Sequence, residues 1–111
     1  MTDDMETWLI DAGDEVIQKK VATGLDGLSP VDRAIYALWV VDYAVRNSGI
    51  LLPMSEIYPA ALVELRAFAA ISDLPALALL AGSTPDDAAF CDGYYRHFEM
   101  ASQELKLAMA G

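Results

Sequence analysis

Four polar residues have the types and spacing to build a small catalytic or ligand-binding pocket. They are Asp42, Tyr43, Asn47 and His97. Asp42 stands in an otherwise apolar run, and a buried carboxylate needs a partner because desolvating an unpaired charge is costly. Arg46 follows four residues later, which is the favourable order for an acid–base pair on one face of a helix. Other possible partners of Asp42 are Arg33, Arg66 or a tyrosine hydroxyl. The spacing predicts a helix-bracing ion pair, and it leaves a functional carboxylate open as the alternative.

The other groups suited to catalysis or metal binding stand alone in the sequence. His97 is the only histidine and could serve as a general base or a metal ligand, but no partner lies near it in the chain. Cys91 is the only cysteine, which excludes an internal disulfide and a cysteine-based zinc site, and we interpret it as a small buried apolar residue. The chain has no phosphate-binding loop and no Ser/His/Asp spacing. We therefore predict a protein that is not an enzyme and has no cofactor and no metal site.

Acidic residues form the broadest pattern in the chain. The chain has seventeen acidic and seven basic residues, and its formal net charge is −10. This balance disfavours direct binding to nucleic acid or to an anionic membrane, and it permits a basic partner. The acids cluster near both termini, and those predicted to bind a partner are Asp3, Asp4, Glu6, Asp11, Asp14, Glu15, Asp86, Asp87, Asp92 and Glu99, with Glu104 continuing the second cluster.

A helix spaces such carboxylates about 5–6 Å apart at positions i, i+3 and i+4, which is comparable with the spacing of phosphates along one DNA strand. A rigid acidic helical face could therefore imitate a nucleic-acid backbone. The alternative is that the acids are simply solvated and keep an apolar domain in solution.

One helix, expected over residues 30–48, would position Asp42, Tyr43 and Asn47. Ser29 can cap its N-terminus, Pro30 suits the first helical position, and Gly49 can adopt the positive φ that ends a helix. Residues 35–45 are apolar on nearly every side of such a helix. A helix of this kind is normally buried, so we place it at the centre of the fold.

The rest of the chain also favours helices, and no segment shows the alternation of a strand. Residues 50–59 contain two prolines and are expected to form a loop or a short helical turn. Further helices are predicted over residues 3–21, from Ser55 or Tyr58 to the break at Ser72-Asp73, over residues 74–81 with Pro75 at the start, and from Pro85 to the end of the chain. The sequence therefore predicts an all-α fold in which one domain, residues 1–111, packs four to five helices around residues 30–48.

Length and composition set the broad class of the protein. The chain has 111 residues, of which 55% are hydrophobic, too many for a disordered chain. No apolar run reaches the roughly 18 residues of a membrane-spanning helix. The sequence begins M-T-D-D-M-E, which is acidic where a secretory signal is basic, so we predict a cytoplasmic protein.

Three segments together resemble a known family. They are L-S-P-V-D-R-A-I-Y-A-L-W-V-V-D-Y-A-V-R-N-S-G at residues 28–49, A-A-L-V-E-L-R-A-F-A-A-I at residues 60–71 and D-G-Y-Y at residues 92–95. The likeness, over about residues 28–98, is to the helical domain-of-unknown-function family typified by a dimeric DNA-mimic protein. The resemblance implies a non-enzymatic protein that binds a basic DNA-binding protein such as a transcription regulator, and it implies a homodimer. It assigns no catalytic residues.

Two alternatives from other functional classes stay open at the level of the sequence. One is a small-molecule binder or enzyme with its pocket near Asp42 and Asn47. The other is a purely structural subunit that dimerises through surplus apolar surface.

Overall fold

The computed structural model describes the backbone of residues 4–48, 52–82 and 87–110, and the side chains of residues 7–24, 26–47, 54, 56–82, 94 and 97–108. Every regular element within these residues is a helix. In chain order they are α1 (Asp4–Thr23), the 3₁₀ turn η1 (Leu25–Gly27), α2 (Pro30–Ser48), α3 (Leu52–Ile57), α4 (Ala61–Ser72), α5 (Pro75–Ala81) and α6 (Asp87–Ala110). The predicted all-α fold is confirmed, with five helices of seven or more residues in the described part and the short α3 in addition.

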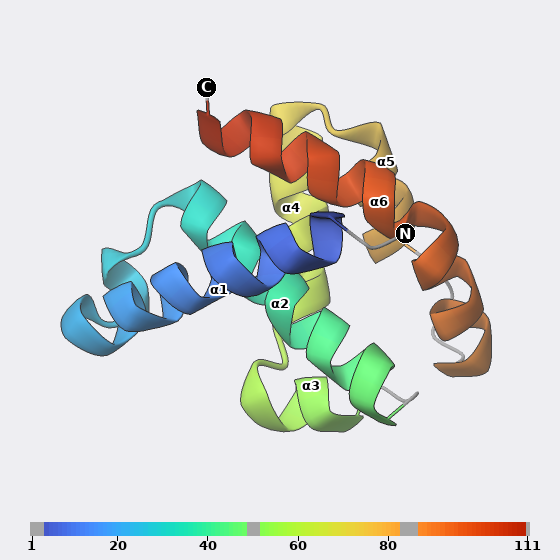
Figure 1. Ribbon diagram of the computed structural model, residues 1–111, viewed down its shortest axis with the longest axis horizontal. Coiled ribbons are helices and arrows are strands. Elements are labelled where there is room, and N and C mark those ends of the chain that lie inside the picture. The colour runs from blue at the N-terminus through green and yellow to red at the C-terminus, as the bar shows by residue number, and fades with distance from the viewer. Residues whose placement is uncertain (1–3, 49–51, 83–86, 111) are drawn as a thin grey trace.

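The helix α2 lies at the centre of the fold, as its sequence predicts. It contacts α1, α3, α4 and α6. In Figure 1, α1 crosses α2, and α3 lies near the C-terminal end of α2. Ile35, Leu38 and Val41 of α2 are fully buried. Burial of this apolar surface is the main favourable contribution that α2 makes to stability.

The start of α2 follows from its local sequence. The Asp32 amide donates to Ser29 Oγ at 3.2 Å, and the Arg33 amide donates to the Ser29 carbonyl at 2.9 Å. The predicted Ser29 cap is therefore confirmed. Asp32 also accepts a hydrogen bond from Lys19 Nζ at 3.0 Å, which joins the end of α1 to the start of α2. Gly49, predicted to end α2, lies outside the described residues.

The start predicted for the helix that ends at Ser72-Asp73 is wrong. Neither Ser55 nor Tyr58 begins it, because α3 ends at Ile57 and α4 begins only at Ala61. The chain turns between the two helices, where the Ala61 amide donates to the Tyr58 carbonyl at 3.0 Å. The Tyr58 side chain is buried and its ring lies 5.2 Å from that of Tyr36, so tertiary packing fixes this turn. The predicted break at Asp73 is confirmed, since that residue has the left-handed φ of 56°.

The short helix α5 begins one residue after the predicted start and ends at Ala81 as predicted. Both of its ends bind side chains from other helices. At its N-terminus, the Ala76 and Leu77 amides donate to the two Glu104 carboxylate oxygens at 3.0 and 2.9 Å. At its C-terminus, Arg66 Nε donates to the Ala81 carbonyl at 3.0 Å. Glu104 is thus a structural cap, so its carboxylate is engaged within the fold.

Candidate functional site

The carboxylate of Asp42 joins α2 to α6. Asp42 Oδ1 accepts hydrogen bonds from Arg46 Nε at 2.7 Å and from the Tyr94 hydroxyl at 2.5 Å. The guanidinium of Arg46 in turn lies 4.7 Å from the centre of the Phe98 ring. The predicted helix-bracing ion pair is therefore confirmed. The sequence allowed a tyrosine hydroxyl as a partner of Asp42 but did not single out Tyr94, because Tyr94 lies 52 residues from Asp42 and only the packing of α6 brings it there.

A hollow of about 340 Å³ lies beside this ion pair, between α1 and α2. We call it the α1–α2 hollow, and its lining residues are Ile10, Trp39, Asp42, Tyr43, Arg46 and Asn47. Three of the four residues predicted to form a pocket line it. His97 does not, and its half-buried side chain belongs to α6. The Asn47 side chain donates from Nδ2 to the Tyr43 carbonyl at 3.0 Å, so it also braces the last turn of α2.

A row of aromatic rings runs along α2 to the α1–α2 hollow. The ring centres of Tyr36 and Trp39 are 6.5 Å apart, those of Trp39 and Tyr43 are 5.9 Å apart, and both pairs are stacked. Trp39 rests on the backbone of α1 at Gly13, where an added Cβ would come within 2.9 Å of Trp39 Cγ. The close approach of the two helices therefore needs a residue without a side chain at Gly13. Sequence reasoning missed this contact, although a glycine inside a helical pattern was a usable signal.

Exposed carboxylates occupy the outer side of α1. We call Asp11, Asp14 and Glu15 the acidic face of α1, and all three are exposed. Within the described part of the chain none of them forms an ion pair. Glu99 is exposed on α6, which contacts α1, and it accepts a hydrogen bond from Gln103 at 3.5 Å. The other predicted partner-binding side chains lie outside the described residues, and they are Asp3, Asp4, Glu6, Asp86, Asp87 and Asp92.

Most of the cations in the described part of the chain hold helices together. Lys19 pairs with Asp32 at 3.0 Å, and Lys20 Nζ lies 5.4 Å from the centre of the Tyr36 ring. Three further cations are engaged by carboxylates or a carbonyl, and they are Arg33, Arg46 and Arg66. Most of these cations thus contact partners within the fold, while the charge of the acidic face of α1 is not compensated by a described cation.

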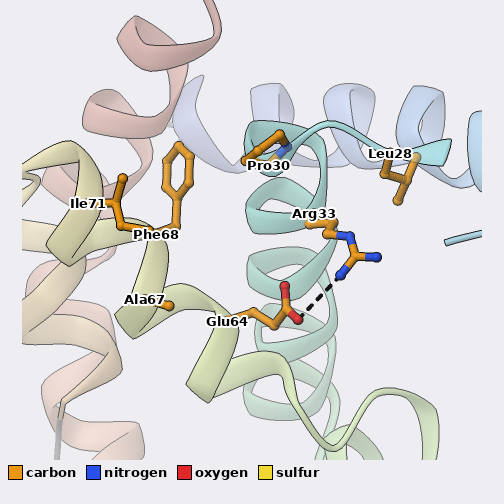
Figure 2. A pocket seen from close by; sticks show the side chains of 7 residues that line it. All are labelled: Leu28, Pro30, Arg33, Glu64, Ala67, Phe68 and Ile71. Carbon is orange, nitrogen blue, oxygen red and sulfur yellow. Dashed lines mark ion pairs between the residues drawn. The ribbon is translucent and has the colours of Figure 1, made fainter. Parts of the chain in front are cut away.

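A second hollow, of about 410 Å³, lies between the start of α2 and α4. We call it the α2–α4 groove, and its lining residues are Leu28, Pro30, Arg33, Glu64, Ala67, Phe68 and Ile71. Figure 2 shows Arg33 and Glu64 facing each other at one end, with 3.6 Å between Nη1 and Oε2. Phe68 and Ile71 of α4 form the other end. The sequence did not predict this groove, because it depends on how α4 lies against α2.

The buried Tyr58 hydroxyl lies close to Glu64. Burial raises the pKa of Tyr58 above its ordinary value, and the Glu64 carboxylate raises it further because a second negative charge disfavours the phenolate. The two groups are near each other but fall short of hydrogen-bond geometry. This neighbourhood makes Tyr58 a titratable group whose protonation is linked to folding.

Neither a metal cluster nor a membrane span is found among the described residues. No three histidine, cysteine or acidic side chains in that part of the chain are placed to hold a metal ion. No helix there combines the length and the apolar character that crossing a bilayer requires. No family model matches the chain, and comparisons with curated proteins and with solved structures gave no significant match. The resemblance of residues 28–98 to the DNA-mimic family therefore stays a prediction.

Proposed function

We propose that this protein is a non-enzymatic, cytoplasmic binding module that attaches to a basic protein through the acidic face of α1. The observation that carries the proposal is that acidic side chains on α1 are left unpaired while most cations are paired within the fold. Asp11, Asp14 and Glu15 are exposed and unpaired, whereas most described cations are committed to internal partners. A surface of one sign raises the local concentration of oppositely charged partners and speeds their association.

The spacing on α1 supports a partner with regularly placed cations. Asp11 precedes Asp14 by three residues and Glu15 by four, so the three carboxylates are neighbours on one side of the helix. Like charges at these spacings repel one another by about 0.2–0.5 kcal/mol per pair. A basic partner relieves that repulsion on binding. A DNA-binding protein offers such a surface, and in this proposal the acidic face of α1 takes the place of the phosphate backbone.

Two narrower parts of the proposal rest on the family resemblance alone. They are the assignment of the partner as a transcription regulator and the assignment of a homodimer. Both can be tested with the same purified protein, by identifying captured proteins and by measuring the mass in solution.

The test is capture of partners on the immobilised protein at low and at high salt, with duplex DNA as competitor. The double variant Asp11→Asn/Glu15→Gln removes two charges from the acidic face of α1. The matched control Glu56→Gln/Asp73→Asn removes the same two residue types from exposed positions elsewhere. We expect capture of basic DNA-binding proteins that DNA and salt both weaken, and that only the first variant loses. The proposal would be overturned if the amount of captured protein did not depend on salt, or if both double variants lowered that amount equally.

A further inference from the structure

The aromatic row on α2 holds a cation at one end and lies open at the other. At the first end, Lys20 lies over the Tyr36 ring. At the second end, the Tyr43 side chain is 43% exposed and its ring is stacked on Trp39 within the α1–α2 hollow. No cation of the described residues lies over Trp39 or Tyr43. Aromatic faces carry partial negative charge and attract cations, so the open end is suited to a cation from outside the chain.

The charges around the α1–α2 hollow complement such a cation. Inside it, the charge of Arg46 is balanced by Asp42 at 2.7 Å. On its α1 side, Ile10 lines the hollow, and Asp14 follows Ile10 by four residues, so Asp14 lies on the same side of the helix. Asp14 is exposed and unpaired. Asp14 therefore adds a negative charge on the α1 side of the hollow.

We propose that the α1–α2 hollow binds one arginine side chain of the basic partner, stacked against Tyr43 and bordered by Asp14. This inference rests on the proposed function and specifies the chemistry of the partner. A guanidinium is planar, stacks on aromatic rings and sheds water more readily than an ammonium group. The hollow therefore favours arginine over lysine, and the acidic face of α1 supplies attraction that either cation would feel.

The probes are two fluorescein-labelled peptides of equal length, one of arginine and one of lysine, whose binding is followed by anisotropy at low salt. Tyr43→Leu keeps an apolar side chain at the hollow and removes the ring. Phe68→Leu is the matched control, because it makes the same kind of change in the α2–α4 groove. We expect Tyr43→Leu to weaken the arginine peptide about fivefold and the lysine peptide much less. Phe68→Leu should change neither, and melting curves show that each variant is folded.

The outcomes separate this inference from the proposed function. If Asp11→Asn/Glu15→Gln weakens both peptides while Tyr43→Leu changes nothing, the arginine site is overturned and the acidic binding surface is retained. If Tyr43→Leu and Phe68→Leu weaken the arginine peptide equally, the site is likewise overturned. A second readout is the proton spectrum of the bound arginine peptide, in which stacking on a ring shifts side-chain resonances upfield. Absence of that shift, or of any binding of the arginine peptide to the unmodified protein, also overturns the site.

Discussion

Asp42 accepts hydrogen bonds from donors on two different helices, so a conservative substitution there should lower stability. We expect Asp42→Asn to lower the free energy of unfolding by about 2 kcal/mol, because it removes the negative charge that the partly buried Arg46 faces at 2.7 Å. Urea unfolding monitored by circular dichroism measures the change. Tyr94→Phe is the control for the second donor, and it should cost about 1 kcal/mol. An Asp42→Asn protein as stable as the unmodified one would show that the ion pair contributes nothing.

Tyr58 links stability to alkaline pH. Its pKa is raised in the folded protein by burial and by Glu64, whereas in the unfolded chain it is about 10. The folded state therefore holds the phenolic proton more tightly, and stability falls as pH rises above the unfolded value. We expect Tyr58→Phe to lose less stability between neutral and strongly alkaline pH than the unmodified protein does. Urea unfolding at several pH values measures this, and parallel losses in the two proteins would contradict it.

At the scale of elements, α5 depends on its neighbours to satisfy its ends. A seven-residue helix is marginal by itself, and the Glu104 carboxylate binds two of its free amides. We expect Glu104→Gln to destabilise the protein by about 1–2 kcal/mol and to speed hydrogen exchange at the Ala76 and Leu77 amides. Glu99→Gln changes an exposed acid on the same helix and should do neither. Equal effects of the two substitutions would exclude a specific cap.

The crossing of α1 and α2 is set by the contact between Gly13 and Trp39. An added methyl group at position 13 would lie within 3.2 Å of Trp39 Cβ and closer still to its ring. We expect Gly13→Ala to destabilise the protein by about 1–2 kcal/mol, since the clash outweighs the roughly 1 kcal/mol that alanine gains in helix propensity. Thermal unfolding measures the loss. Trp39→Phe in the same chain should recover part of it, and a loss unchanged by the smaller ring would locate the strain elsewhere.

Across the whole molecule, the helix ends set by nearby residues could be predicted from the sequence, and the contacts between residues far apart in the chain could not. Ser29 and Pro30 mark the start of α2 within a few residues, and Pro75 and Gly82 bound α5 in the same way. The pairing of Asp42 with Arg46 also lies within one helical turn. By contrast, Tyr94 contacts Asp42 of α2, and Glu104 contacts α5, only because α6 packs against both α2 and α5. The lining of both hollows depends in the same way on how helices cross.

The surplus of acidic residues should make the thermal stability of the protein depend on salt. With a net charge of −10, exposed carboxylates repel one another, while paired charges such as Asp42 and Arg46 are partly buried and less screened by salt. Added salt should therefore raise the melting temperature, by about 3 °C between low and physiological ionic strength.

The acidic face of α1 should account for a share of that gain. Asp11→Asn/Glu15→Gln removes two of its three charges, so this variant should start from a higher melting temperature at low salt and gain less from added salt. Thermal unfolding over a salt series measures both quantities. The control for this measurement is Glu56→Gln/Glu99→Gln, which removes two charges from exposed positions outside α1 and makes the same change in net charge. It separates repulsion within α1 from the effect of overall charge. If both double variants respond alike, the charge of α1 is ordinary solvated surface, and α1 holds no repulsion for a partner to relieve.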